Sequence, residues 1–274
     1  MKTINAQDGT QLYVKQWGVG RPVIFIHGWP LSADSWDDQA LAIAEEGFRV
    51  IAYDRRGFGR SEQPWNGYDY NTLADDLAAV IEQTQASDAT LVGFSMGGGE
   101  VARYLSRHHG HNISQVALIS SVVPYLLKTT DNCDGVDSSV FHEMIGGILE
   151  DRPHFFADFF NDFFGVGLLS SPVSDEQLEW TRSLAMQASL KATIECIKSF
   201  SSTDFREDLA AFSMPTLLIH GTHDKTVPIE LTSRKIANAI PHAKLIEYEG
   251  APHGLLVTHK DQISQDLINF IKMH

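Results

Sequence analysis

The feature that most constrains the fold is the pentapeptide Gly-Phe-Ser-Met-Gly at residues 93–97. An apolar run typical of a buried strand, residues 89–92, precedes it, and a stretch suited to a helix, residues 98–107, follows it. In this setting the turn is so tight that Ser95 takes a strained backbone conformation and exposes its hydroxyl at the helix N-terminus. Flanking glycines are needed because a Cβ there would collide with the strand or the helix. The motif therefore predicts that Ser95 is a nucleophile and that the Met96 N–H faces a developing oxyanion.

Segments typical of strands and of helices alternate along most of the chain. Residues 22–26 form a continuous apolar run, as expected for a strand buried on both faces, and residues 10–17 alternate like an exposed strand. Thr72 and Gly47 are expected to mark a helix start and a helix end. Further strands are expected over residues 48–53, 89–92, 116–119, 216–219 and 244–248, and helices over 35–46, 72–85, 98–107, 230–240 and 261–272. This order predicts an α/β fold with a mostly parallel central sheet flanked by helices.

The alternation breaks between about residues 123 and 208. No run typical of a buried strand occurs there, and helices are expected over residues 141–145, 155–164 and 177–200, the second of them rich in phenylalanine. A helical insertion after a strand lies over the carboxyl edge of an α/β sheet, where such sheets bind ligands. We therefore predict a single structural domain with a core, residues 1–122 and 209–274, and a helical cap, residues 123–208, inserted after the strand ending near Ile119.

A base and an acid for Ser95 follow later in the chain. Asp224 comes just after the strand over residues 216–219, and His253 comes after the strand over 244–248. Both then lie at the edge of the sheet that holds Ser95, in the order along the chain typical of hydrolases with this turn. In such a triad His253 takes the hydroxyl proton and returns it to the leaving group, while Asp224 fixes the histidine tautomer and stabilises the imidazolium. Each taken alone would be read as a turn aspartate and a surface histidine.

Other histidines compete for a role. Three of them lie between residues 108 and 111, at the C-terminal end of the helix after Ser95, where basic groups interact favourably with the helix dipole. No carboxylate or thiolate accompanies them at ligand spacing, so no metal site is predicted. His220 and His223 flank Asp224 but are too local in sequence to bridge to Ser95.

The composition limits the environment and the partners. The chain has 274 residues, enough to bury a substantial core, and no apolar stretch approaches the ~18 residues of a membrane span. A formal charge of −14 argues against nucleic acid and anionic membranes as partners. Cys133 and Cys196 cannot form a disulfide framework, and residues 1–7 lack the apolar core of a signal peptide. We expect a cytoplasmic globular protein, and a homo-oligomer is compatible with this sequence.

Together these motifs resemble a known family over nearly the whole chain, namely the α/β-hydrolases of the cofactor-free haloperoxidase, perhydrolase and aryl esterase subfamily. The matching segments are His-Gly-Trp-Pro at residues 27–30, Asp-Arg-Arg-Gly-Phe-Gly-Arg-Ser at 54–61, Gly-Phe-Ser-Met-Gly-Gly-Gly-Glu at 93–100, His-Gly-Thr-His-Asp at 220–224 and Pro-His-Gly at 252–254. The resemblance implies the α/β-hydrolase fold, serine carboxylesterase activity without a cofactor, and a structural role for residues 54–61. It also implies that the backbone N–H of Trp29 is the second oxyanion donor beside that of Met96.

The residue at the turn separates neighbouring activities. Haloalkane dehalogenases and epoxide hydrolases carry an aspartate where this chain has Ser95, so the resemblance disfavours both. Hydrolysis of lactones or lactams stays open, because ring opening uses the same acyl-enzyme chemistry. A non-catalytic binding protein of the same fold is a further alternative, although such proteins typically lack one or more triad members.

Apolar residues are expected to decide which substrate fits. Phe159 and Phe163 are spaced i, i+4 and share one helix face, and the resemblance favours them as walls of the substrate pocket. It places Val122, Tyr125 and Val227 around the acyl group. A tight aromatic pocket suits small esters with short acyl chains.

Pro30 is the remaining predicted pocket residue and concerns a second substrate, hydrogen peroxide. Proline fixes its own φ and pushes the preceding residue towards an extended conformation, so it constrains the direction of the Trp29 carbonyl. In the resembling haloperoxidases this carbonyl is interpreted as an acceptor for hydrogen peroxide, which competes with water for the acyl-enzyme and releases a peracid. The alternative, that Pro30 only shapes the loop, stays open. The expected partners are therefore a small ester or carboxylic acid and hydrogen peroxide.

Overall fold

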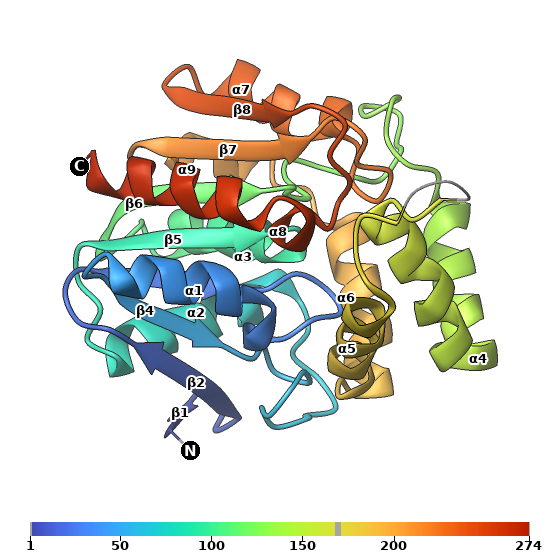
Figure 1. Cartoon of the computed structure of the whole chain (residues 1–274), viewed down its shortest axis with the longest axis horizontal. Coiled ribbons are helices and arrows are strands. Elements are labelled where there is room, and N and C mark those ends of the chain that lie inside the picture. The colour runs from blue at the N-terminus through green and yellow to red at the C-terminus, as the bar shows by residue number, and fades with distance from the viewer. Residues whose placement is uncertain (1, 168–170, 274) are drawn as a thin grey trace.

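The computed structural model describes residues 2–167 and 171–273 and is built around one sheet (Figure 1). Within these residues the sheet has eight strands in the order β1-β2-β4-β3-β5-β6-β7-β8. β2 pairs antiparallel with β1 and β4, and all pairs from β4 to β8 are parallel. The strands are β1 Lys2–Asn5, β2 Gln11–Trp17, β3 Pro22–Ile26, β4 Arg49–Tyr53, β5 Ala89–Phe94, β6 Ile113–Ile119, β7 Thr216–Gly221 and β8 Ala243–Tyr248. The predicted α/β fold with a mostly parallel sheet is confirmed.

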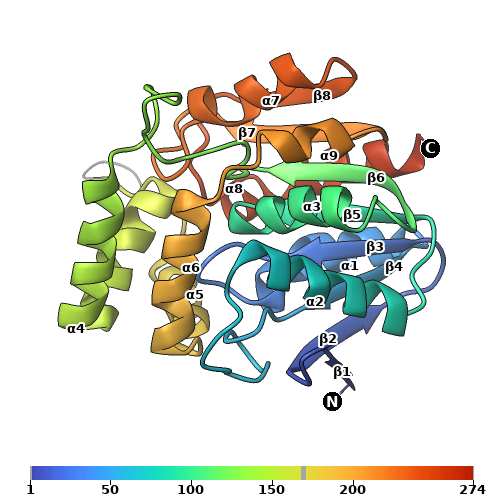
Figure 2. The ribbon, with the colours of Figure 1, turned by 180° about the vertical axis from the view of Figure 1, so that it is seen from behind.

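Helices cover both faces of the sheet (Figures 1 and 2). α1 (Asp37–Glu45) and α9 (Lys260–Lys272) pack together on one face, with α8 (Leu255–Thr258) adjoining α9. α2 (Tyr70–Gln83) and α3 (Met96–Arg107) pack together on the other face, and α7 (Ser233–Ala239) lies against β7 and β8. Because both faces are covered, β3, β5 and β7 are buried along their whole length, which explains their largely apolar sequences.

Some helix starts differ from the predicted ones. α2 begins at Tyr70 rather than Thr72, because the Asp69 carboxylate accepts from the Thr72 N–H at 3.1 Å and caps the helix. The helices expected over residues 35–46 and 230–240 are each preceded by a separate 3₁₀ turn, Ala33–Trp36 and Ile229–Leu231. α1 ends before Gly47, whose φ of 86° is the left-handed conformation expected of a glycine in this position.

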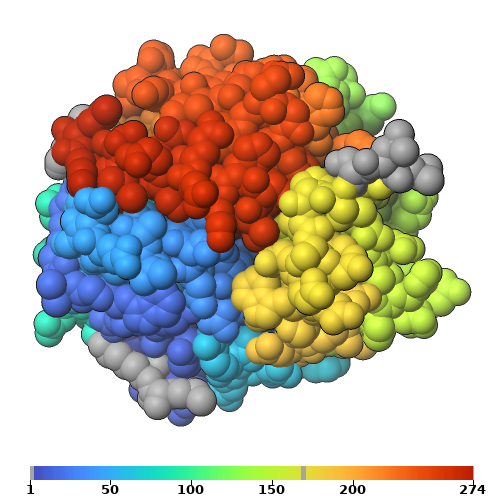
Figure 3. All heavy atoms as spheres, in the orientation of Figure 1, coloured from blue at the N-terminus to red at the C-terminus, as the bar shows by residue number. Residues whose placement is uncertain are grey.

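Within the described residues, three α-helices lie between β6 and β7 in the chain, and we call them the helical cap: α4 (Ser138–Phe164), α5 (Asp175–Met186) and α6 (Leu190–Ser202). In Figure 1 they lie together beyond the carboxyl ends of the parallel strands, and in Figure 3 they form the yellow and light-green side of the molecule. α4 is kinked at Asp151, whose Oδ1 accepts from the His154 N–H at 3.0 Å and so starts a second helical half. That half carries four buried phenylalanines, Phe156, Phe160, Phe163 and Phe164.

Candidate active site

Ser95 lies at the tip of the turn between β5 and α3. Its φ is 53° and its ψ is −119°, a conformation that residues other than glycine rarely adopt. The Ser95 N–H donates to the Ile119 carbonyl at 2.9 Å, which ties the turn to the end of β6. A Cβ on Gly93 would lie 2.8 Å from the Gly97 carbonyl oxygen, and one on Gly97 would strike the Ile26 carbonyl. The predicted strained turn, and its need for glycine on both sides, are confirmed.

Ser95, His253 and Asp224 form a continuous chain of hydrogen bonds. His253 Nε2 lies 3.0 Å from Ser95 Oγ, and His253 Nδ1 lies 2.6 Å from Asp224 Oδ2. Their exposed fractions are only 6 %, 1 % and 6 % for Ser95, His253 and Asp224. Because an ionised carboxylate can only accept, Nδ1 carries the proton in its bond to Asp224, and Nε2 is left free to accept from the serine hydroxyl. Three loops that leave β5, β7 and β8 thus bring the three predicted residues together.

Asp224 is held as an ionised acceptor. Its Oδ1 accepts from the backbone N–H groups of Thr226 at 3.0 Å and Val227 at 2.7 Å. Burial raises the pKa of the Asp224 carboxyl, but the charge of His253 and hydrogen bonds from His220 and His253 outweigh it, so the pKa lies well below its ordinary value. Asp224 therefore orients His253 without itself taking up a proton.

Two aromatic rings fix the plane of the His253 imidazole. Phe94 lies against it with ring centroids 5.1 Å apart, and Phe163 contacts it edge-on at 5.0 Å. The Gly254 N–H also donates to the Phe163 carbonyl at 2.7 Å, so the histidine loop is tied to the end of α4. The helical cap therefore helps to position His253.

A cavity of about 420 Å³ opens above Ser95 between the sheet edge and the helical cap. Apart from Ser95 itself, polar side chains reach it only at Asp162, Lys225 and Thr226 among the residues that line it. Its apolar lining is Trp29, Met96, Val122, Leu126, Val136, Val140, Phe141, Met144, Phe159, Phe200, Val227 and Pro228. A volume of this size and an apolar wall are typical of a site for a small organic molecule.

Three of the six residues predicted to form the pocket line this cavity, namely Val122, Phe159 and Val227. The other three do not. Phe163 is turned towards His253, and Tyr125 packs beneath the Arg206 guanidinium, which lies 5.3 Å from its ring centroid. Pro30 is buried in the loop after β3. In their place the cavity is lined by α4 and α6 residues that the sequence did not single out, among them Phe141, Met144 and Phe200. Which of these side chains reach the cavity depends on how the helical cap packs over the sheet edge, and helical spacing alone does not give that.

Trp29 and Met96 both border the cavity beside Ser95. Met96 is the first residue of α3, where backbone N–H groups have no partner within the helix. The Trp29 side chain has a separate structural role: its Nε1 donates to the Thr193 carbonyl at 3.0 Å, and its ring packs edge-on against Phe159 at 5.4 Å. The peptide bond between Trp29 and Pro30 is cis. The role of the Trp29 and Met96 backbone N–H groups as oxyanion donors stays a prediction.

A buried ion pair supports the loop after β3 and the helix after Ser95. Arg55 pairs with Glu100 on α3, and Tyr53 Oη donates to the same carboxylate at 2.6 Å. The Arg55 backbone N–H donates to His27 Nε2 at 3.0 Å, and its guanidinium donates to the His27 carbonyl at 2.6 Å. These contacts hold α3 and the His27–Trp29 segment in fixed relation. They agree with the structural role that the resemblance implied for residues 54–61.

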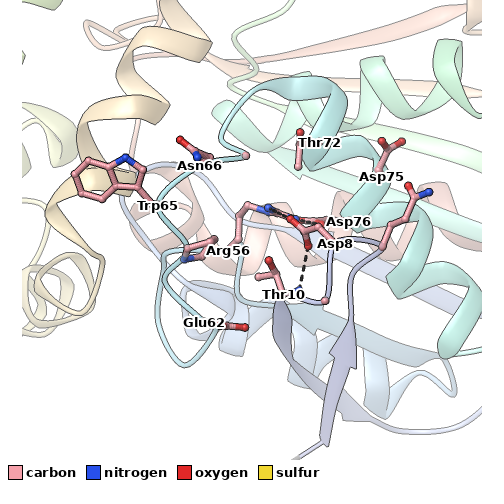
Figure 4. A pocket seen from close by; sticks show the side chains of 13 residues that line it. Asp8, Thr10, Arg56, Glu62, Trp65, Asn66, Thr72, Asp75 and Asp76 are labelled. Carbon is pink, nitrogen blue, oxygen red and sulfur yellow. Dashed lines mark hydrogen bonds and ion pairs between the residues drawn. The ribbon is translucent and has the colours of Figure 1, made fainter.

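A second, polar cavity lies away from Ser95, between the β1–β2 turn and α2 (Figure 4). Its volume is about 680 Å³, larger than that of the apolar cavity. Its central cation, Arg56, already binds the Asp76 carboxylate at 2.6 Å and the Asp8 carboxylate at 2.7 Å. Arg56, through its hydrogen bond, lowers the pKa of Asp8 to about 2. The charge of Arg56 is therefore already paired with the Asp8 and Asp76 carboxylates. The geometry for acyl chemistry is at Ser95.

The histidines between residues 108 and 111 follow the end of α3 at Arg107. His108 Nε2 lies 2.8 Å from the Asp75 carboxylate, which also binds Arg107. Within residues 2–167 and 171–273 no group of three His, Cys, Asp or Glu side chains is arranged to hold a metal ion. In the same described part of the chain, none of the helices combines the length and apolar character needed to cross a membrane.

Comparison with known proteins identifies the family. The model of the alpha/beta hydrolase fold family matches residues 21–260. The chain belongs to this family. Among curated relatives, this α/β hydrolase is 41 % identical to non-heme chloroperoxidase CPO-A1 of Kitasatospora aureofaciens, with 99 % of each chain covered. It is also 41 % identical to the bifunctional esterase/perhydrolase DCH of Acinetobacter calcoaceticus, with 99 % of this chain and 100 % of that one covered.

A solved structure agrees with this assignment. The crystal structure of bromoperoxidase from Bacillus anthracis matches with a TM-score of 0.94 and 43 % identity, and covers 99 % of this chain and 100 % of its own. The α/β-hydrolase fold and the subfamily expected from the sequence are therefore confirmed.

Proposed function

We propose that this α/β hydrolase is a serine esterase for small carboxylic esters that also transfers the acyl group to hydrogen peroxide. The observation that carries the proposal is the hydrogen-bonded chain Ser95–His253–Asp224 at the floor of an apolar cavity. The names of the relatives, a non-heme chloroperoxidase and a bifunctional esterase/perhydrolase, support the same pair of reactions.

In the first half-reaction Ser95 Oγ attacks the ester carbonyl while His253 Nε2 takes its proton. The negative oxygen that forms would be bound by the N–H groups of Met96 and Trp29. Collapse of this intermediate breaks the bond to the alcohol, which takes the proton from His253 and leaves. The acyl group stays bound to Ser95 Oγ. Ionised Asp224 stabilises the imidazolium while it holds that proton.

In the second half-reaction water or hydrogen peroxide attacks the acyl carbonyl. His253 takes a proton from the attacking oxygen, the Ser95 Oγ–acyl bond breaks, and the proton returns to Ser95. Water gives a carboxylic acid, and hydrogen peroxide gives a peracid, which then oxidises halide in solution. We propose that the Trp29 carbonyl, directed by Pro30, accepts a hydrogen bond from hydrogen peroxide and so favours it over water.

The helical cap, as part of one structural domain with the sheet, supplies the acyl cavity in this proposal. Phe141, Met144 and Phe159 on α4 and Phe200 on α6 form its outer wall. The two cysteines are unpaired, Cys133 exposed and Cys196 buried, which fits a reducing compartment, and we place the enzyme in the cytoplasm.

A panel of short esters, lactones and amides, with and without hydrogen peroxide, tests the proposal. We expect ester hydrolysis in water, and peracid formation with halide bromination when peroxide and acetate are present. Turnover of lactones alone would favour the lactonase alternative. A folded protein that turns over no member of the panel and resists a fluorophosphonate label would instead be a non-catalytic binding protein.

Phe159 and Phe163 should affect the reaction differently, although they share one helix. In the native protein we expect acetate and butyrate esters to react faster than octanoate, because the Phe159 ring packs against Trp29 and closes the cavity wall. Phe159→Ala should raise kcat/KM for octanoate relative to acetate by about tenfold. Phe163→Ala should lower kcat for every chain length instead, because its ring contacts His253. Chain-length profiles of the two variants are the measurement, and identical profiles would contradict the assignment.

Pro30 should control the choice between water and peroxide. Pro30→Leu relaxes the constraint on the Trp29 carbonyl, so we expect perhydrolysis to fall relative to hydrolysis of the same acyl donor. The measurement is halide-dependent bromination in acetate buffer beside ester hydrolysis, for the native protein and the variant. Pro228→Leu, at a proline that borders the cavity and does not adjoin Trp29, is the control. An unchanged ratio in Pro30→Leu would remove this residue from the peroxide step.

A further inference from the structure

A second histidine contacts the triad aspartate. His220 is the last residue but one of β7 and has no exposed surface. Its Nε2 lies 2.8 Å from the Val227 carbonyl oxygen and 3.2 Å from Asp224 Oδ2, the same oxygen that binds His253 Nδ1. Its Nδ1 lies 2.7 Å from Ser233 Oγ at the start of α7. The sequence indicated that His220 is too local to reach Ser95, but it did not anticipate this contact with Asp224.

The partners of His220 determine which nitrogen carries the proton. The Val227 carbonyl and the Asp224 carboxylate can only accept, so Nε2 must be the N–H and is shared between them. Nδ1 can then accept from the Ser233 hydroxyl, which is both donor and acceptor. This one tautomer satisfies every contact, and the Val227 carbonyl and the Asp224 carboxylate select it. His220 therefore donates to Asp224 through Nε2.

We infer that His220 is a positioning residue that holds Asp224 and the loop after β7 in the arrangement needed by His253. This inference rests on the proposed serine hydrolase function. Asp224 then has all four of its donors: two backbone N–H groups on Oδ1 and two imidazoles on Oδ2. Through the Val227 carbonyl the same imidazole also fixes a residue that lines the acyl cavity.

Other charged groups near this pair are already bound or exposed. Glu247 lies opposite His220 in the β7–β8 register, and its carboxylate binds the Arg234 guanidinium at 2.7 and 2.8 Å. His223 and Lys225 lie on the loop that carries Asp224, and both are exposed. Loss of the His220 donor is therefore expected to act on the two buried groups beside it, Asp224 and His253.

Two substitutions separate donation from mere packing. His220→Leu removes the donor, whereas His220→Gln keeps an N–H near the position of Nε2. With a short aryl ester we expect His220→Leu to lower kcat about tenfold to a hundredfold with little change in KM, and His220→Gln to recover most of the rate. Without the His220 donor more negative charge on Oδ2 acts on His253 and favours its protonated form. The acid limb of the kcat/KM profile should therefore move to higher pH in His220→Leu only.

The rate of fluorophosphonate labelling of Ser95, measured over the same pH range, distinguishes two outcomes: that the His220 inference is wrong, or that the proposed function is wrong. An unlabelled native protein would contradict the function itself. A labelled native protein with equal labelling rates and equal acid limbs in His220→Leu would overturn the role of His220, and so would an equal loss in His220→Leu and His220→Gln. Should His220→Leu not fold, Ser233→Ala provides the test, because it removes the hydrogen-bond partner of Nδ1 and so loosens the hold on the imidazole. We expect Ser233→Ala to show a smaller loss of kcat, and native kinetics there would contradict the inference.

Discussion

Ser95→Ala should abolish nearly all esterase activity, with kcat for a short aryl acetate lower by a factor of about 10⁴–10⁶. The Ser95 Oγ lies 3.0 Å from His253 Nε2, and Ser95 borders the acyl cavity. Without it no acyl-enzyme forms, so peracid formation and bromination should be lost together with hydrolysis. Alanine tolerates the backbone of this turn no worse than serine, so we expect thermal unfolding to stay near that of the native protein.

Initial rates, bromination and a thermal melt on the same preparation measure this effect. Ser120→Ala is a suitable control, because Ser120 also follows a strand at the carboxyl edge, and its buried Oγ has no hydrogen-bond partner within the described residues. Native-like activity in Ser120→Ala would show that removing a serine at this edge does not by itself abolish esterase activity. Substantial esterase activity in Ser95→Ala would remove Ser95 as the nucleophile.

Asp224→Asn should lower kcat by about 10⁴ while leaving the site geometry intact. The backbone N–H groups of Thr226 and Val227 would hold the amide oxygen in place of Oδ1, so the amide NH₂ would face His253. An NH₂ group donates, and it would force His253 Nδ1 to accept and Nε2 to carry the proton. In that tautomer Nε2 cannot take the proton of Ser95. The loss should appear in kcat, with KM for the ester little changed.

The low pKa of Asp224 gives this prediction its specificity. The carboxyl is ionised at every pH where the native enzyme works, so lowering the pH towards 5 should not reproduce the Asn phenotype by protonating Asp224. Asp162→Asn, which neutralises an exposed carboxylate at the rim of the same cavity, is the matched control and should keep near-native kcat. If Asp224→Asn kept native kcat, another carboxylate would have to orient His253.

The sheet and the three triad residues could be predicted because each depends on local sequence. Buried strands such as β3 and β5 are short apolar runs, and the turn at Ser95 needs glycine at fixed positions. The positions of Asp224 and His253 follow from parallel topology, which places the ends of successive strands at one edge. Helix starts were less accurate, since Asp69 and Thr72 are both good caps and only the backbone path decides between them.

The pocket could not be predicted to the same extent, because it depends on how the helical cap is turned. Phe159 and Phe163 share one helix face, yet Phe159 lines the cavity and Phe163 contacts His253. The two differ because Phe163 lies one turn further along, at the C-terminal end of α4, beside the loop that carries His253. The contact of His220 with Asp224 could have been suspected from their i, i+4 spacing, but that spacing has no regular meaning across a strand end and a loop. Only the bend of the loop after β7 brings the two together.

The most direct test of an acyl-enzyme on Ser95 is a rapid quench of the native protein with a short aryl acetate, followed by mass spectrometry of its peptides. We predict one acetyl group on the peptide that contains Ser95, lost faster when hydrogen peroxide is added and with peracetic acid as the product. Ester turnover without acetylation of that peptide, or an acetyl group found on another residue while Ser95 stays free, would contradict the proposed mechanism.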